Sequence, residues 1–424
     1  MKTTIWILLS VLACVVTCLY TARVLGPWEH YVNVEHGNLK NQMGDLYSPW
    51  MGTRELLLHG SNPYGPEVSH EIQMAFYGHA IDQNYGEPGA NVINEQRFAY
   101  PVYVVFLLAP TVHADFQKLQ VWAAATLAVL TALSVLLWMD VLRWRPPKAL
   151  IATLILFTLS TPQVMQGLRL RQLGLVVAFL VALSAWCVIR NHLALAGIAL
   201  ALSTIKPQMV VLPLAWLLLW GMSAWPRRWP LLAGFGIALA SLITLGELLL
   251  PGWPHLFLNG LLAYRNYVAT PSILSTVLGG SFGLVVSGIT VIGLLAFAWR
   301  NRQADTASAG FIQVLAAFLL GAALILPLMY PFNQVLLLLP AMMIAKDWPS
   351  LPRLLRRVLA VVVAWPWIVR LVLLLLPPRL DSMSRLPLLP SALTLFVPVL
   401  LSMLFAISWK AAKLRPQASD LPLS

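Results

Sequence analysis

The chain has 424 residues, of which 59% are hydrophobic and only 10% are charged. Because about 25% of the residues of soluble globular proteins are charged, this composition excludes a soluble protein and predicts an integral membrane protein. The net charge of +12 does not indicate nucleic-acid binding, since Lys and Arg lie in short clusters between apolar runs, where they orient a membrane protein. Cys14, Cys18 and Cys187 lie inside apolar runs, which excludes a disulfide framework and a cysteine-rich metal site.

Apolar runs recur at intervals of about 20 residues, the length that a helix needs to cross a bilayer. The first run, Ile5 to Leu25, follows Lys2 and has no small-residue cleavage site, so we expect a retained helix and not a signal peptide. The later spans are predicted at 119–140, 149–161, 172–189, 193–205, 208–225, 231–250, 273–299, 309–329, 333–345, 356–377 and 388–409. The pattern predicts one all-α polytopic domain over residues 1–424, with about twelve transmembrane helices.

The segment Tyr100 to His113 decides on which side every later loop lies, because its 14 residues can cross thinly or dip in and return. If it crosses, the cytoplasmic basic residues are Arg169, Arg171, Lys206, Arg265, Arg379 and Arg385. If it returns, they are Lys2, Arg143, Arg145, Lys148, Arg190, Arg227, Arg228, Arg300, Arg302, Lys346, Arg353, Arg356, Arg357, Lys410, Lys413 and Arg415. The second arrangement satisfies the positive-inside rule at nearly every short loop. We therefore expect cytoplasmic termini, including the tail 411–424.

The other side of the membrane then carries a long first loop, 26–97, and two moderate loops, 251–271 and 378–389. Nine of the sixteen acidic residues lie in the first loop: Glu29, Glu35, Asp45, Glu55, Glu67, Glu71, Asp82, Glu87 and Glu95. Catalytic chemistry is therefore expected in this loop.

Within the first loop, Ser48 before Pro49 is a good helix start and Gly60 is a good stop, which predicts a short helix over 49–58. This helix is apolar enough to lie on the membrane surface. Asp45 then precedes an interfacial helix, where its carboxylate can take a proton from a hydroxyl group. The alternative is that Asp45 only caps the helix or a turn.

Four short elements follow one another along the chain. They comprise an Asp, an aromatic residue and a helix ending in Gly before Pro-Tyr (Asp45, Tyr47, Gly60, Pro63, Tyr64); an aromatic-Tyr-Pro start to an apolar segment (Phe98, Tyr100, Pro101, Pro110); a Gln before an apolar helix (Gln172); and an Ala-Gly helix closing in Lys-Pro (Ala196, Gly197, Lys206, Pro207). In this order they resemble polytopic glycosyltransferases of the GT-C superfamily, in particular the family-87 polyprenol-phosphate-dependent mannosyltransferase-like proteins. The sequence departs from that pattern at Arg171, where Gly is usual, and near Asn333, where many relatives carry a His.

The resemblance implies a GT-C fold and transfer of one sugar, a mannose-like hexose or a pentose, with inversion. The donor would be a polyprenyl-phosphate sugar, the acceptor a hydroxyl group of a lipid or glycan, and the site periplasmic, on a bacterial inner membrane. Asp45 would be the catalytic base. The leaving phosphate needs cations more than an acid, and Lys206, Arg169 and Arg171 end helices on the same side. One of the two arginines is expected to contact it, and all three residues have an alternative as interfacial anchors.

Further candidates for substrate binding are Tyr64, Tyr100, Gln172, Asn333 and Gln334, although both tyrosines also fit an aromatic belt. Glu247 is a candidate because an acid inside a span is functional by default, unless it reaches the interface near Pro251. The histidines lack metal-ligand spacing, so we expect no zinc and no cofactor, while a divalent cation near Asp45 is left open.

A transporter or flippase of a lipid-linked glycan is the rival interpretation, because it would also need about twelve crossings and buried charges. Transporters usually contain internal repeats. No such repeat is found between the two halves, and a long acidic first loop is unusual for a transporter. The sequence therefore favours the glycosyltransferase.

Overall fold

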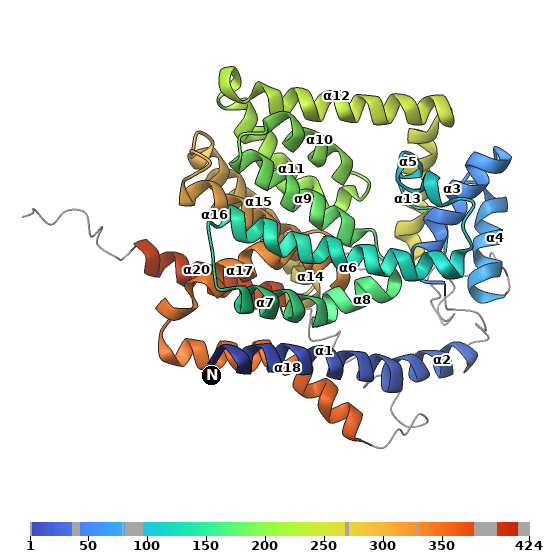
Figure 1. Cartoon of the computed structure of the whole chain (residues 1–424). Helices are drawn as coiled ribbons and strands as arrows, with labels where there is room; N and C mark the ends of the chain where they lie inside the picture. The colour runs from blue at the N-terminus through green and yellow to red at the C-terminus, as the bar shows by residue number, and fades with distance from the viewer. Residues whose placement is uncertain are drawn as a thin grey trace, which may run out of the picture.

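The computed structural model describes residues 2–35, 43–78, 80, 96–267, 271–327, 330–376 and 397–413, and within these ranges every regular element is a helix (Figure 1). The predicted loop 378–389, part of the last predicted span, most of the predicted tail 411–424 and parts of the first loop lie outside the described residues. The all-α fold class is confirmed for the residues that the structure describes.

The N-terminal part of the chain comprises a long helical arm and the short helices of the first loop. Its elements are α1 (Lys2–Tyr20), η1 (Thr21–Leu25), α2 (Gly26–Glu35), α3 (Tyr47–His59), α4 (Pro66–Tyr77), α5 (Val104–Leu108) and η2 (Ala109–Thr111). The predicted first span ends too early at Leu25, because the helix continues through Gly26 and Pro27. A π-helical turn, η1, lies directly before this pair and shifts the hydrogen-bond register, so that the Gly26 N–H donates to the Thr21 carbonyl.

The remaining helices form the main body. They are α6 (Phe116–Val141), α7 (Lys148–Ser160), α8 (Pro162–Leu170), α9 (Gly174–Ile189), α10 (Leu193–Ser203), α11 (Pro207–Met222), α12 (Trp225–Leu249), α13 (Trp253–Tyr267), α14 (Ile273–Leu278), α15 (Gly280–Asn301), α16 (Ala309–Ile325), η3 (Pro331–Leu337), α17 (Leu338–Asp347), η4 (Trp348–Ser350), α18 (Arg353–Leu375) and α20 (Val397–Lys413). Buried side chains of α9, α10, α11 and α16, such as Val177, Leu200, Trp216 and Leu315, form its core.

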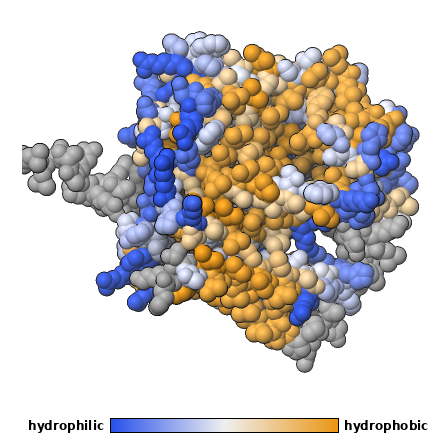
Figure 2. All heavy atoms as spheres, viewed as in Figure 1, coloured by the Kyte–Doolittle hydropathy of each residue, from blue (hydrophilic) through white to orange (hydrophobic). Residues whose placement is uncertain are grey.

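The surface carries a broad apolar band between two hydrophilic edges, as expected of a chain embedded in a bilayer (Figure 2). Five helices among the described residues are long and apolar enough to cross a membrane, or six if α7 and α8, which meet at a 62° bend, form one broken span. The predicted number of twelve crossings is not confirmed. Helices such as α10, with 11 residues, and α17, with 10, are shorter than the ~20 residues that span the hydrocarbon core.

The segment 98–113 lies at the same end of the molecule as α3 and α4, on the right in Figure 1. Its helix α5 has only five residues, too few to cross a bilayer. The Tyr64 hydroxyl donates to the Tyr100 carbonyl (2.7 Å), and the Trp50 indole N–H donates to the Thr111 carbonyl (3.1 Å). Both ends of the segment are thus held to the first loop, whereas the side of the membrane on which they lie stays a prediction.

Two glycines allow α10 and α12 to pack backbone to backbone. A Cβ atom on Gly234 would lie 2.3 Å from the Ala194 carbonyl oxygen, and one on Gly197 would lie 2.2 Å from the Leu231 carbonyl oxygen. Because backbone atoms cannot move aside as a flexible side chain does, the two helices would have to separate to accept any larger residue.

We therefore expect Gly234→Ala to destabilise the protein by about 1–3 kcal/mol, the usual cost of overpacking a core. The measurement is the thermal unfolding midpoint of the purified protein in detergent. Gly236→Ala is the matched control on the same helix, since a Cβ atom there meets nothing within 4 Å and Ala is the better helix former. Equal shifts for both variants would contradict the close contact.

Candidate functional site

The loop that carries Asp45 is fixed to the end of α8. The Asp45 backbone N–H donates to the Leu170 carbonyl (2.8 Å), and Gly44 before it has a φ of +64°. A Cβ atom on Gly44 would come within 3.0 Å of the same carbonyl oxygen. A glycine is needed here both for the positive φ and for the close approach, and α3 begins two residues after Asp45. The structure confirms the predicted helix, extended to Tyr47–His59, and Gly60 ends it at a φ of +70°.

The turn after α8 brings Gln172 toward the same loop. Arg171 ends the helix with a φ of +54°, and the Gln172 backbone N–H donates to the Gly167 carbonyl (2.8 Å). A left-handed conformation at this position favours Gly, because a side chain costs ~1–2 kcal/mol there. Arg171 adopts this conformation despite its side chain, and the side chain lies beside Gly44.

A line of hydrogen bonds joins Asp45 to the centre of the main body. Gln172 Nε2 donates to Asp45 Oδ2, and Gln172 Oε1 accepts from Lys206 Nζ (2.6 Å). Lys206 Nζ also donates to Asn333 Oδ1 (3.3 Å) and lies 4.9 Å from the centre of the Phe332 ring. Gln172, Lys206 and Asn333 are buried, whereas Asp45 is only partly buried. The structure therefore brings together four of the residues that the sequence singled out.

Residues that sequence reasoning missed hold this line in place. A Cβ atom on Gly174 would lie 2.9 Å from Asn333 Oδ1 and 3.6 Å from Lys206 Nζ, so the bare backbone of α9 makes room for both side chains. The Tyr103 hydroxyl donates to the Thr204 carbonyl (3.0 Å), and this bond fixes the turn between α10 and α11 that carries Lys206. The position of Gly174, directly after Gln172-Leu173 and at a helix start, was the signal available in the sequence.

The electrostatics of the line follow from its burial. Burial raises the pKa of Asp45 above its usual range, although the Gln172 hydrogen bond and the charges of Lys206 and Arg169 oppose the shift. Burial lowers the pKa of Lys206 to about 8, and the Asp45 charge opposes this shift. Within the described residues Lys206 has no ion-pair partner, because Gln172 stands between it and Asp45. The site thus holds a carboxylate of raised basicity and a cation that lacks an adjacent anion.

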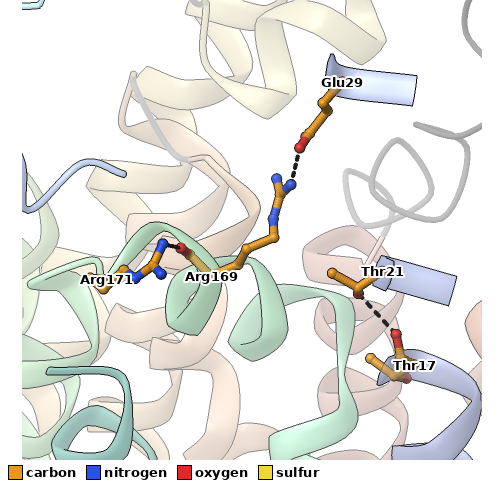
Figure 3. Close-up of polar contacts among 5 residues, drawn as sticks. All are labelled: Thr17, Thr21, Glu29, Arg169 and Arg171. Carbon is orange, nitrogen blue, oxygen red and sulfur yellow. Dashed lines mark hydrogen bonds and ion pairs between the residues drawn. The ribbon is translucent and has the colours of Figure 1, made fainter. Parts of the chain in front are cut away.

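The two candidate arginines point in different directions (Figure 3). Arg171 Nη1 donates to the Arg169 carbonyl, and this nitrogen lies beside Gly44. The Arg169 side chain extends away from it to α2, where its Nη1 forms an ion pair with Glu29 Oε2. Of the two, Arg171 is the one next to the Asp45 loop.

The remaining candidates have other contacts. Tyr64, in the turn between α3 and α4, packs edge-on against Phe98 (ring centres 5.1 Å apart). Its hydroxyl donates to the Tyr100 carbonyl, so Tyr64 joins this turn to the segment 98–113. Gln334 Oε1 accepts from Gln163 Nε2 at 3.5 Å. Glu247 is exposed and accepts from the Gly252 backbone N–H (2.7 Å), which caps the turn after α12. No hydrogen bond or ion pair found among the described residues joins Tyr64, Gln334 or Glu247 to the Asp45 line.

Among the described residues, no group of three or more His, Cys, Asp or Glu side chains is arranged to hold a metal ion. Glu55 and His59, one helical turn apart on α3, form an acid–histidine pair with 2.8 Å between Oε2 and Nδ1.

The sequence model of glycosyltransferase family 87 matches residues 98–327, which is more than half of the chain. The matched part contains Arg169, Arg171, Gln172 and Lys206, whereas Asp45 and Asn333 lie outside it. Neither a curated protein nor a solved structure matches the chain.

Proposed function

Because the chain belongs to glycosyltransferase family 87, we propose that it transfers one sugar from a polyprenyl-phosphate donor to a hydroxyl group of a lipid or glycan acceptor. The acceptor oxygen attacks the anomeric carbon as the bond from that carbon to the phosphate oxygen breaks, so the configuration inverts. The proton of the acceptor goes to Asp45, and the electron pair of the broken bond leaves with the polyprenyl phosphate. The reaction takes place on the outer face of the membrane, with both termini in the cytoplasm.

The observation that carries this proposal is the hydrogen-bond line from Asp45 through Gln172 to Lys206. Gln172 donates to Asp45 Oδ2, and within the described residues Oδ1 has no hydrogen-bond partner. A carboxylate that is oriented through one oxygen can accept a proton on the other, and its raised pKa makes it a stronger base.

The reaction also needs positive charge to stabilise the leaving phosphate, and Lys206 and Arg171 can supply it. Among the described residues, the hydrogen bonds of Lys206 Nζ go to the neutral oxygens of Gln172 and Asn333. A phosphate oxygen in place of a neutral acceptor gives the buried ammonium the charged partner that it lacks, and such a hydrogen bond is roughly twice as strong. Arg171, beside Gly44, supplies a second cation. Membership in a glycosyltransferase family favours this chemistry over transport of a lipid-linked glycan.

The test is to incubate the purified protein, without any ion gradient, with a panel of polyprenyl-phosphate sugars and candidate lipid acceptors. We expect release of polyprenyl phosphate together with one sugar added to the acceptor in the inverted configuration. A nucleotide sugar should not be consumed. The absence of release from every polyprenyl-phosphate sugar would refute the proposed donor class.

The pH dependence of kcat/KM tests the two titrating groups. Asp45 must be ionised to accept a proton, so activity should rise as the pH passes through its raised pKa. Lys206 must be protonated to bind phosphate, so activity should fall as the pH rises through about 8. In Lys206→Arg the alkaline fall should disappear, because Arg stays charged. An unchanged alkaline fall in that variant would assign it to another group.

A further inference from the structure

An ion pair ties the N-terminal arm, which we define as η1 and α2, to the end of α8. Arg169 Nη1 contacts Glu29 Oε2 (Figure 3), and the two side chains are 24% and 32% exposed. The helix before the arm, α1, packs along α7 and α18, whereas α2 has few contacts with the main body. The partly exposed ion pair therefore bridges two elements that otherwise pack loosely against each other.

The arm has a built-in irregularity at its base. The π-helical turn η1 joins α1 to α2, and Pro27, which has no N–H to donate, follows it. The Thr21 hydroxyl donates to the Thr17 carbonyl (2.9 Å), a side-chain bond that competes with the helical ladder. The residues Thr4–Tyr31 still form one continuous helix, and η1 with Pro27 is the point at which such a helix bends most readily.

The surface is hollowed between the N-terminal helices and the main body (Figure 2). Figure 2 shows the surface hollowed between the lower apolar helices and the body above them, toward the right, with hydrophilic side chains at its margin. The α1 helix, which leads into the arm, exposes large apolar side chains, including Leu8, Leu12 and Val15, as expected for contact with acyl chains. A lipid could thus enter this hollow from the side, with its polar head toward the margin.

Arg169 is not fully satisfied by Glu29. It contacts the carboxylate through Nη1, and its Nε, like that of Arg171, is buried without a hydrogen-bond partner among the described residues. Guanidinium groups bind phosphate through two parallel N–H groups. Arg169 also lies close enough to Asp45 for its charge to act on that carboxyl. An anion on Arg169 would therefore lie between the arm and the reacting centre.

We propose that the gap between α2 and α8 is a lateral portal for the phosphate head of the lipid donor, and that Glu29 is its latch. In the empty protein the Glu29 carboxylate occupies Arg169. The phosphodiester of the arriving donor carries the same single charge but offers two non-ester oxygens to the parallel N–H groups of the guanidinium, and so takes the place of the carboxylate. Repulsion between the two anions then moves α2 outward at η1. The lipid's identity rests on the proposed function, but the anion exchange on Arg169 does not.

The test compares Glu29→Gln with the parent protein in binding of farnesyl phosphate to the full-length chain in detergent. Gln has nearly the same shape as Glu but no charge, so phosphate no longer competes with a carboxylate. We expect affinity for farnesyl phosphate to rise about 2- to 5-fold, the range given by exposed ion pairs. Glu67→Gln, on the exposed first turn of α4, is the matched control and should leave the affinity unchanged.

The outcomes separate the latch from the proposed function, because binding needs neither acceptor nor turnover. Tighter binding by Glu29→Gln supports the latch even if no polyprenyl-phosphate sugar is consumed. Unchanged or weaker binding overturns it, even if the parent is an active transferase, since Glu29 would then orient Arg169. Inorganic phosphate that binds as tightly as farnesyl phosphate would indicate a free-phosphate site and overturn the lateral portal, as would failure of the parent to bind farnesyl phosphate.

Discussion

Asp45→Asn should lower turnover by about 10²- to 10⁴-fold, the contribution of a general base, while the fold is kept. The new side chain has nearly the same shape, and its amide oxygen can still accept the hydrogen bond from Gln172. The backbone bond from residue 45 to the Leu170 carbonyl does not involve the side chain. Because the protein raises the pKa of Asp45, it already favours the neutral form of this group. A neutral side chain should therefore not lower the thermal unfolding midpoint.

The measurement is the rate of polyprenyl-phosphate release at saturating donor and acceptor. Asp115→Asn is the control, since Asp115 caps α6 by accepting from the Lys118 N–H and Asn caps a helix equally well. It should turn over like the parent. If Asp45→Asn does the same, Asp45 is only a turn residue and the base must be sought elsewhere.

Much of the site could be predicted because residues with restricted backbones and isolated polar residues identify the ends of its helices in the sequence. Gly60 ends α3 at a positive φ, and Pro49 and Pro207 begin helices, as their backbone restrictions require. The residues Asp45, Gln172 and Lys206 were each found at an element end, where polar groups meet an apolar chain. Their joining into one line could not be predicted, since it depends on how α8, α10 and η3 pack, and pairing across 127 residues leaves no local signal.

In the sequence, the end of the first span was placed too early and one buried arginine was overlooked, because each was judged from its immediate neighbours. Gly26-Pro27 was taken as the end of the first span, but the π turn before it lets the helix continue. Arg370 was overlooked although it is a charge inside an apolar helix. It is 4% exposed, and its Nη1 donates to Thr17 Oγ1 (2.7 Å) and to the Ser160 carbonyl (2.9 Å). It thus joins α18 to α1 and to the bend before α8, a buried position that charged groups in membranes take when paired.

Lys206 lies on the hydrogen-bond line on the far side of Gln172 from Asp45, and Lys206→Met should lower kcat/KM for the donor about 10- to 150-fold. This range corresponds to the loss of a charge-assisted hydrogen bond of ~1.5–3 kcal/mol. Met keeps an apolar stem of similar length against Phe332. Lys206→Arg should recover only part of the loss, because a planar fork does not replace a compact ammonium in the space that Gly174 leaves. The apparent affinity for the acceptor should change much less, since its hydroxyl meets Asp45.

Lys206→Met also removes the hydrogen bonds that Lys206 donates to Gln172 Oε1 and Asn333 Oδ1, so a loss of activity could come from local rearrangement. The pH dependence of kcat/KM distinguishes loss of the positive charge from local rearrangement. The parent loses its own ammonium charge as the pH rises through about 8, whereas Met cannot titrate. The ratio of kcat/KM between parent and variant should therefore shrink toward one between pH 7 and pH 10. A ratio that stays constant over this range would mean that Lys206 acts through its shape and hydrogen bonds, and the cation for the donor phosphate would then be Arg171.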